Sequence, residues 1–560
     1  MIVPFRKILE AKPHRPVYMM HRYFARRPYN LFQELIKHYS AEGDLILDPF
    51  CGGGVTVVEG LLLKRKVIGV DLNPLAIYVT RMEISPVDVQ AFRESWKTLE
   101  NEVREVMDFL YGTDCPNCKG DSFFGPSRAW VEWSEWEDGE IKRIKYRCPQ
   151  GHSGEKAPTK GDLERIEEIE ANFERYVREW GLWYPKYPIP PGDKTTSMIN
   201  KGYHFFHQLF TKRNLLALAI LHKHIKEVAD PSIKEFLLFA LSASLKWASK
   251  QSHLRGDIVE GWAMHAYWIY PKWLEINVWR TFANRCRAIE RGKVDVKNLK
   301  GYVRFAESFK DFQKDATVML LAQSADELPL PDNSVDCIIT DPPYGSNVNY
   351  GELSDYWLVW LEGWLDGRLP GVMDKEKEII INKTQGKSLE DYEALLYSVF
   401  SECYRVLKAD RPLVVTFNSK DLRIISAFLR AVTRAGFELV KDGVMYQSPV
   451  RLYTTTFHAK EVGAFTGDFV FTFRRADYPL EERTELAEAQ VMKLVEETLE
   501  NSLTEVQARK RIYLELIPLI AYSAAAMGPE LYSTVQAVER RIRAHKFASL
   551  HFTEARKIAR

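Results

Sequence analysis

The sequence of 560 residues contains no apolar stretch long enough to cross a bilayer, which takes about 20 mostly apolar residues. Its longest apolar runs are Phe236–Leu245 and Leu516–Met527, and Pro518 interrupts the second. Residues 1–12 mix charged and apolar side chains and lack the long apolar stretch of a secretory signal. We therefore expect a cytoplasmic protein that does not bind a membrane.

The sequence also has few cysteines and almost no net charge. Seven cysteines, an odd number in so long a chain, do not suggest the disulfide framework of a secreted domain. Lys and Arg number 77 against 76 for Asp and Glu, so the chain as a whole is not polycationic, although a local basic cleft can still contact nucleic acid. A composition of 46% hydrophobic and 27% charged residues argues against a mainly disordered or fibrous chain.

Strands and helices alternate in two parts of the sequence that lie far apart, residues 1–86 and residues 311–478. The expected strands are residues 45–47, 67–70, 318–321, 337–340, 413–417 and 469–474. The expected helices are residues 30–39, 56–63, 389–407 and 424–435. This alternation predicts one α/β domain with a parallel sheet that is split by an insertion.

The intervening residues 87–310 lack this alternation. They predict a charged helix, a cysteine-bearing segment, a proline-rich break at residues 184–192, and helices at residues 213–228 and 233–250. We therefore expect a large, mostly helical insertion. Residues 479–560 also predict helices, which would form a separate C-terminal region.

A buried strand, an acidic residue, a glycine turn and a helix follow one another around Asp48. The sequence of residues 48–54 is Asp-Pro-Phe-Cys-Gly-Gly-Gly. Glycines let the backbone approach a ligand, and a helix N-terminus offers unpaired N–H groups. The Asp48 carboxylate would repel a phosphate and attract an ammonium, so a ligand with an amino-acid end fits better than a dinucleotide. Asp71 ends the next strand, where a ribose diol is usually bound, and capping of the helix at Pro74 is the alternative role.

The sequence Asp-Pro-Pro-Tyr at residues 341–344 directly follows the predicted strand 337–340. The two prolines have no N–H groups, so the Asp341 carboxylate and the nearby carbonyls form a rigid corner of acceptors beside an aromatic ring. Such a corner suits a planar base with an exocyclic amine, because the acceptors hold the N–H groups while the ring stacks on the base. A plain turn is the alternative interpretation.

Four side chains with nitrogen or sulfur donors lie in two short motifs of the insertion. They are Cys115 and Cys118 in Cys-Pro-Asn-Cys, and Cys148 and His152 in Cys-Pro-Gln-Gly-His. Two such knuckles around a β-rich spacer predict a tetrahedral Zn²⁺ site in a zinc ribbon at residues 113–153. Because protein would occupy all four positions, we expect this metal to be structural. The tryptophans of the spacer would either contact nucleic acid or brace the insertion, and they are Trp130, Trp133 and Trp136.

Residues 48–54 resemble the S-adenosylmethionine (AdoMet) motif of amino-group DNA methyltransferases, and residues 341–344 resemble their catalytic motif. Residues 21–28 are similar to the segment that closes over the methionine end of AdoMet in this class. Residues 341–357 further resemble the prokaryotic adenine-specific DNA methylases that contain a Zn ribbon. The resemblance implies a Rossmann-like AdoMet-dependent methyltransferase domain split by the insertion.

The resemblance also implies roles for single residues. Members of the class often carry an Asp at the position of Ser324, so Asp326 could replace the missing carboxylate. The residues that would bind AdoMet are Asp48, Pro49, Phe50, Gly52, Gly54, Asp71 and Ser324. The residues that would carry the catalysis are Asp341, Pro342, Pro343 and Tyr344.

The implied reaction is methyl transfer to an exocyclic amine, whose lone pair is delocalised into the base. Asp341 and the Pro342 carbonyl would accept the two amine hydrogens while Tyr344 stacks on the flipped base. The nitrogen itself attacks, so no cysteine nucleophile is needed and we expect Cys337 and Cys403 in the core. The expected substrate is adenine N6 in double-stranded DNA. Cytosine N4 is the first alternative, and RNA methylated at guanine N2 or adenine is the second.

Basic and aromatic residues mark candidate contacts with nucleic acid. They are the run Arg22, Arg26 and Arg27, residues 246–255, and residues 262–279. Core packing is the alternative for the tryptophans. One subgroup of these enzymes carries its target-recognition region between the two motifs, so residues 87–310 are the candidate for sequence readout. No nuclease constellation is evident, and a restriction or defence-system protein would be a separate partner.

Overall fold

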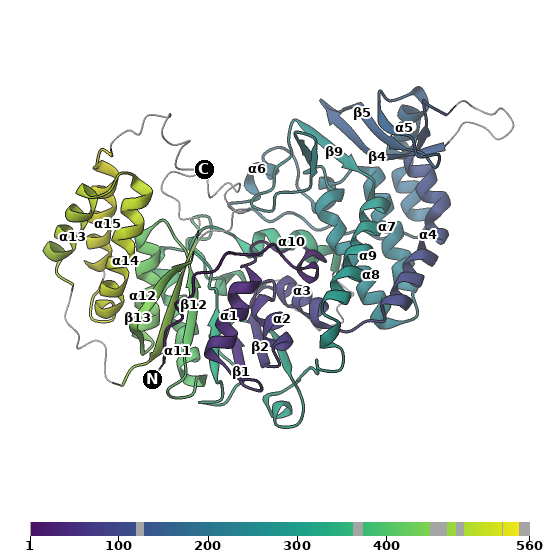
Figure 1. Cartoon of the computed structure of the whole chain (residues 1–560). Coiled ribbons are helices and arrows are strands. Elements are labelled where there is room, and N and C mark those ends of the chain that lie inside the picture. The colour runs from purple at the N-terminus through teal and green to yellow at the C-terminus, as the bar shows by residue number, and fades with distance from the viewer. Residues whose placement is uncertain are drawn as a thin grey trace.

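The computed structural model describes residues 2–118, 128–361, 373–447, 467–477, 486–528 and 530–547. A seven-stranded sheet forms the centre of the larger part of the molecule, with the strand order β10-β2-β1-β11-β12-β14-β13 (Figure 1). Its strands are β1 (Leu45–Asp48), β2 (Lys66–Asp71), β10 (Val318–Ala322), β11 (Cys337–Thr340), β12 (Leu413–Phe417), β13 (Phe437–Gln447) and β14 (Asp468–Arg475). Residues from both sides of the insertion therefore share one sheet.

Alternate residues of each strand face opposite sides of the sheet, because side chains in a strand point up and down in turn. Ile46 of β1 belongs to one hydrophobic cluster, and its neighbours Leu45 and Leu47 belong to another. The first face packs against α1 (Tyr29–Tyr39), α2 (Val55–Leu62) and α3 (Pro74–Ile84), and the second against α11 (Leu389–Val406) and α12 (Leu422–Arg434). The predicted split α/β domain is thus confirmed as three layers.

The end of the sheet differs from the prediction of parallel strands. β14 runs antiparallel to both β12 and β13, and β13 was not predicted at all. β13 is hard to recognise in the sequence because Asp442-Gly443 is a turn signal, whereas here these two residues lie within a single strand. Asp442 has a φ of 58°, and the pairing register shifts between Leu439 and Val444, so a bulge absorbs these residues.

The insertion leaves the sheet after α3 and returns before β10. Its long helices are α4 (Val89–Tyr111), α5 (Lys160–Glu179), α7 (Lys212–Glu227), α8 (Pro231–Ala248) and α9 (Val278–Asp295), and α6 (Thr196–Ile199) is a single turn. A second sheet consists of β3 (Gly112–Asp114), β4 (Arg128–Glu137), β5 (Glu140–Arg147), β6 (Ser153–Lys156) and β9 (Lys272–Ile276). A small hairpin is formed by β7 (His253–Arg255) and β8 (Ile258–Glu260). The insertion is mostly helical, as predicted.

Buried polar contacts fasten the insertion to the sheet domain. The ammonium of Lys293, on α9, donates to the carbonyls of Met82, Glu83 and Ser85 at the end of α3. The buried carboxylate of Glu352, on α10 (Tyr350–Leu361), accepts from the backbone N–H groups of Asp193 and Lys194. Such contacts between distant segments join the two parts near the middle of the insertion and near its end.

Three helices follow β14, namely α13 (Glu488–Glu500), α14 (Glu505–Ser523) and α15 (Glu530–Ala544). They pack on α12 and β13, and in Figure 1 they lie at the opposite end of the molecule from β4 and β5. Their core residues continue the second hydrophobic cluster. Short 3₁₀ turns elsewhere are Pro16–Met19, Phe206–Leu209, Lys297–Leu299, Phe309–Gln313 and Lys375–Lys377. Within the described ranges, no helix is both long and apolar enough to span a membrane.

Candidate active site and metal cluster

The carboxyl ends of four parallel strands meet at one edge of the sheet. Ser324 follows β10, Asp71 ends β2, Asp48 ends β1 and Asp341 follows β11, and these strands are neighbours in that order. The chain proceeds outward from β1 to β2 and β10, then returns to the other side of β1 with β11. Ligands of open α/β sheets bind at such a switch point.

A cavity of about 920 Å³, including the space at its mouth, lies at this edge. The predicted residues that line it are Asp48, Pro49, Phe50, Gly52, Asp71, Ser324, Asp341 and Pro343. Gly54, Pro342 and Tyr344 lie outside this lining. Both sequence motifs therefore reach one cavity.

Asp48 is buried and joins the two motifs directly. Its Oδ1 atom accepts a hydrogen bond from the Thr340 hydroxyl at 2.6 Å and another from the Phe50 N–H at 3.1 Å. Burial raises the pKa of Asp48 to about 7, although the hydrogen bonds from Thr340, Thr56 and Phe50 oppose the shift. Thr340 immediately precedes Asp341, so the end of β1 and the start of the Asp-Pro-Pro-Tyr corner are in contact.

The glycine turn after Asp48 needs glycine for two separate reasons. Gly54 begins α2 with a φ of 78°, and a Cβ there would approach Thr80 Oγ1 to 2.6 Å. A Cβ on Gly53 would lie 2.5 Å from the Arg26 guanidinium. The turn therefore allows the chain to fold tightly between α3 and the segment before α1.

Asp71 is held by backbone donors. Its two oxygens accept from the N–H groups of Gly52 and Asn73, both at 2.8 Å. Burial raises its pKa to about 6, against the effect of these hydrogen bonds. The cap of α3 is Asn73, which accepts from the Leu75 N–H, so the alternative helix-capping role for Asp71 belongs to its neighbour.

Asp341 lies in a different environment, because a cation pairs with it. Its Oδ2 atom accepts from Arg27 Nε at 2.8 Å, and its Oδ1 atom accepts from the hydroxyls of Tyr344 and Thr416. Arg27 also donates to Asp468 at 2.8 Å. Burial alone lowers the pKa of Arg27, but the carboxylates of Asp341 and Asp468 outweigh it and raise that pKa.

Tyr344 packs beside the Asp341–Arg27 ion pair. The Arg27 guanidinium lies over its ring at 4.7 Å, and Phe417 meets the ring edge-on at 4.8 Å. The Pro343 carbonyl accepts from the Tyr392 hydroxyl at 2.6 Å, which fixes the second proline. Tyr344 therefore faces Asp341 and Arg27 in this structure, and not the cavity.

Ser324 occupies the position at which the resemblance implies a carboxylate. Ser324 lines the cavity, but Asp326 does not and instead pairs with Lys377 at 3.1 Å. Asp326 therefore does not supply to the cavity the carboxylate that residue 324 lacks.

Several cavity residues were not predicted as site residues. Tyr23 comes from the segment before α1 and stacks on Tyr350, and Asn73 donates to Ser354 at 2.7 Å. Glu378 is buried in the cavity wall, where its Oε1 accepts from the Gly351 N–H and its Oε2 has no hydrogen-bond partner. Burial raises the pKa of Glu378 to about 7. Only Tyr23 lies in a motif that could have indicated it.

Arg26, one of the candidate nucleic-acid contacts, has a structural role instead. It forms an ion pair with the buried Glu83 and donates to the carbonyls of Gly53, Tyr18 and His21. Its guanidinium is nearly inaccessible to a ligand, since 5% of the side chain is exposed. The three arginines of this run therefore have separate environments.

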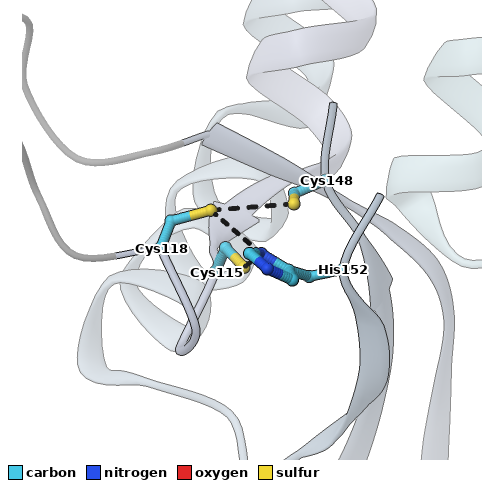
Figure 2. Close-up of side chains that lie close together, drawn as sticks. All are labelled: Cys115, Cys118, Cys148 and His152. Carbon is cyan, nitrogen blue, oxygen red and sulfur yellow. Dashed lines mark hydrogen bonds between the residues drawn. The ribbon is translucent and has the colours of Figure 1, made fainter. Parts of the chain in front are cut away.

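The four Cys and His side chains of the insertion converge in one cluster (Figure 2). Cys115 follows β3, Cys148 follows β5 and His152 precedes β6, so the ends of neighbouring strands bring the two knuckles together. Their ligand atoms all lie within 4.8 Å of one another. The Sγ atoms of Cys118 and Cys148 are 3.7 Å apart, and His152 Nδ1 lies 3.3 Å from Cys118 and 3.7 Å from Cys115.

The two separations of 3.7 Å match those expected around one tetrahedral metal ion. Zn–S bonds of about 2.3 Å and Zn–N bonds of about 2.05 Å place tetrahedral ligands roughly 3.6–3.8 Å apart. Three sulfurs and one imidazole are also the donor set that zinc favours. The cluster is compatible with zinc.

The tryptophans of the spacer mainly brace the insertion. Trp133 is buried, and Trp136 stacks on Trp273 at 5.3 Å and donates to Glu275. β4, which carries them, pairs with β9 near the end of the insertion. Trp130 alone of the three is exposed. Trp262 is likewise buried, against Tyr356 and Trp357.

Comparison with known proteins agrees with this arrangement. The sequence pattern of a family described as DNA methylase matches residues 6–81 and 335–456, on both sides of the insertion. Over these two segments the chain matches the amino-group DNA methylase family. It is thus an AdoMet-dependent DNA methyltransferase that acts on adenine N6 or cytosine N4.

Curated relatives are distant from this methylase. Type II methyltransferase M.MjaII of Methanocaldococcus jannaschii is 20% identical over 452 residues, which cover 78% of each chain. Type II methyltransferase M.MvaI of Kocuria varians is 22% identical over 368 residues, 63% of this chain and 60% of that protein. Type II methyltransferase M.EcaI of Enterobacter cloacae is 36% identical over 58 residues, which cover 10% of this chain and 13% of that protein.

The cavity of the methylase fits AdoMet, which carries a cationic ammonium and a cationic sulfonium. Asp48, Asp71 and Glu378 line it, and among the described residues none of these three carboxylates forms an ion pair. Burial makes each of them favour a proton or a cationic partner. The cations of the wall are already paired, Arg26 with Glu83, Arg27 with Asp341 and Lys377 with Asp326.

Proposed function

We propose that this methylase transfers a methyl group to the exocyclic N6 amine of adenine in double-stranded DNA. The observation that supports it best is the hydrogen bond from Thr340 to Asp48, since it joins a carboxylate suited to a cationic ligand to a corner suited to an amine. A methyl donor bound on the Asp48 side of this contact and an amine bound on the Asp341 side would share one cavity. Holding two reactants side by side in this way lowers the activation free energy by about 7–11 kcal/mol in the best cases.

The cofactor side of the cavity lies at β1, β2 and β10. Asp48 holds the ammonium of the methionine end, with the glycine turn beneath it, and Asp71 binds the ribose diol. Ser324 contacts the adenine ring, without a carboxylate. When bound, AdoMet supplies a methyl group on a sulfonium, which an amine lone pair can attack.

The base side lies at β11 and β12. Asp341 and the Pro342 carbonyl accept the two hydrogens of the amine and so direct its lone pair toward the cavity. Tyr344 turns from its contact with Asp341 to stack on the flipped base. The amine nitrogen is the nucleophile, and Cys337 and Cys403, both fully buried in the core, take no part.

Arg27 positions the acceptor. It fixes the Asp341 carboxylate from one side while Thr416 fixes it from the other. Arg27 pairs with both Asp341 and Asp468, so a neutral amine meets an acceptor that already has a cationic partner. The cofactor side, in contrast, keeps its negative charge for a cationic ligand.

The insertion, residues 87–310, provides target recognition in this proposal. It lies between the two motifs in sequence and adjoins the cavity domain through α3, α8 and α10. The Cys and His cluster at residues 115–152 holds one structural Zn²⁺ that fixes the small sheet.

Residues 1–86 and 311–478 form the catalytic domain, and residues 479–560 form the C-terminal region. Restriction enzymes or other defence proteins are candidate partners, because the relatives are named as type II methyltransferases.

The direct test is incubation with methyl-labelled AdoMet and either duplex DNA or total RNA, followed by nucleoside analysis. Labelled N6-methyladenine in DNA is the expected product. Labelled N4-methylcytosine would overturn the base assignment and leave the DNA methyltransferase intact. Label found only in RNA would overturn the assignment to DNA.

A further inference from the structure

Two cations from distant segments lie over one indole ring, and a third lies near them. Lys246 and Trp247 end α8, Arg285 lies on α9, and Arg22 precedes α1. The ring of Trp247 lies 5.0 Å from Lys246 Nζ and 4.7 Å from Arg285 Cζ. Arg22 is close enough to both cations to affect their ionisation. We call Arg22, Lys246 and Arg285 the cation cluster.

Within the cluster, Lys246 and Arg285 differ from other buried cations in their partners. Among the described residues, no carboxylate lies within ion-pair distance of Lys246 or Arg285. Arg285 Nε is buried without an acceptor, and its Nη1 reaches only the Met19 carbonyl at 3.3 Å. The nearby Glu260 pairs with Arg255 at 3.0 Å. Arg213 on α7, in contrast, is neutralised by Glu275.

Two like charges held together in a partly buried place destabilise each other unless an anion joins them. Burial first, and Arg22 second, lower the pKa of Lys246 to about 8. The same two causes lower the pKa of Arg285 to about 10. Repulsion between these cations therefore destabilises the folded protein at this position, and a bound anion would offset it.

Trp247 makes the cluster a fixed platform. It packs against the buried cluster of Trp133, Leu274 and Ile276, as do residues of the β7–β8 hairpin. The segment after the hairpin is held beside it by the hydrogen bond from the Trp262 N–H to the Lys246 carbonyl at 2.9 Å. A guanidinium stacked on such a ring keeps its edge of N–H donors available for a planar fork of acceptors. Phosphate oxygens are acceptors of this kind.

The cluster lies close to the cavity along the chain. Arg27, which pairs with Asp341, lies five positions after Arg22, so their Cα atoms are at most about 17 Å apart. That distance corresponds to about five base steps of a duplex at 3.4 Å per step along one strand. The segment is also fixed to α8, because His21 contacts Ser242 at 3.1 Å.

We propose that Arg22, Lys246 and Arg285 bind a backbone phosphate of duplex DNA within a few base steps of the target base. This inference rests on the proposed function, and it names the surface that orients the duplex. The contact is independent of sequence, since phosphates carry no base identity. It holds the strand at the junction of the catalytic domain and the insertion.

The test measures how salt weakens the binding of a short fluorescent duplex, by anisotropy between about 50 and 200 mM salt. Each lost phosphate contact is expected to reduce the slope of log K against log salt by about 0.9. We expect this reduction, and several-fold weaker binding, for Arg285→Gln and for Lys246→Gln. Arg287→Gln is the matched control, because it removes the same charge from an exposed position on α9.

A structural role would have a different signature. We expect the melting temperature of Arg285→Gln and Lys246→Gln to be unchanged or raised, because a repulsion is removed, and AdoMet affinity to be unchanged. A clear loss of melting temperature, an unchanged salt slope, or an equal effect of Arg287→Gln would overturn the inference. So would an effect on an RNA hairpin with none on duplex DNA.

The outcome is separable from that of the proposed function. Methylated DNA made by the wild-type protein, together with an unchanged slope in both variants, rejects the phosphate site and leaves the proposed function standing. A reduced slope in a protein whose label enters neither adenine nor cytosine of DNA supports the phosphate site and rejects the proposed function.

Discussion

The two sides of the cavity carry the same chemical group in opposite electrostatic states. On the cofactor side, Asp48 and Asp71 are buried with neutral hydrogen-bond donors, and burial raises their pKa to about 7 and about 6. On the base side, Asp341 is paired with Arg27. The first arrangement favours a cationic ligand, and the second leaves a carboxylate that already has a cationic partner. In the proposed function, this salt bridge separates the role of holding AdoMet from the role of accepting from the amine.

The largest effect is expected from Asp341→Ala. Loss of an acceptor that orients the reacting group should reduce kcat/KM by about 10²–10³-fold. AdoMet affinity should stay within a few-fold, because Asp341 belongs to the base side. Single-turnover methyl transfer and calorimetric AdoMet titration measure the two quantities. Asp326→Ala removes a nearby carboxylate that does not line the cavity, although it pairs with Lys377 of the cavity wall, and should change neither quantity.

Asp48→Asn should have the reverse pattern. A hydrogen bond to a charged group contributes about 1.5–3 kcal/mol, so AdoMet affinity should fall roughly 10- to 100-fold. Wild-type affinity should rise as pH increases through about 7, because the ligand prefers the ionised carboxylate, and the variant should lose this dependence. An equal pH dependence in both proteins would contradict the assignment.

Stability should change in the opposite direction at Asp48. Its pKa in the folded state lies above the usual 3.8, so the folded protein binds the proton more tightly than the unfolded chain. This contribution is present at low pH and is lost as pH rises from about 4 through about 7. Above pH 7 the ligand-free Asp48→Asn protein should therefore melt higher than wild type, as thermal denaturation would show.

Arg27→Gln should weaken the base side more moderately. The variant leaves Asp341 and Asp468 without their shared cation, and we expect a loss of about 2 kcal/mol in stability and about tenfold in kcat, with AdoMet affinity little changed. Arg27→Gln/Asp468→Asn should recover stability, since only one carboxylate remains. Failure of the double variant to recover would show that Arg27 acts by packing alone.

The smallest effect on the cavity is expected from the metal cluster. We expect one zinc per chain by elemental analysis, and its loss in Cys115→Ser/Cys148→Ser. AdoMet affinity should stay within a few-fold, because the cluster belongs to the small sheet of the insertion. Absence of zinc from the wild-type protein would remove the ribbon from the proposal.

Much of the site was predictable because its parts are local. The order of strand, acidic residue and glycine or proline turn can be read in residues 45–54 and again in residues 337–344, and both lie where predicted. The four metal-cluster residues were likewise identified by their spacing. β13 was missed, because a bulge at Asp442 is indistinguishable in sequence from a turn between two strands.

Other parts of the site depend on neighbours that no local pattern specifies. Glu378 lies in an ordinary charged segment, and only the fold buries it in the cavity wall. Arg26 and Arg27 are adjacent in sequence, yet one pairs with Glu83 in the core and the other with Asp341 at the cavity. Their roles follow from the direction in which each side chain leaves the chain.

The amino-acid sequence by itself determined which local units form, because strand periodicity, glycine conformations and proline chemistry act over a few residues. The tertiary structure decided which of these units meet. The contact of Thr340 with Asp48 spans 292 residues and that of Arg27 with Asp341 spans 314, and both require the sheet to close around the insertion. Burial and charge pairing arise only then, and they set the ionisation of carboxylates that look alike in the sequence.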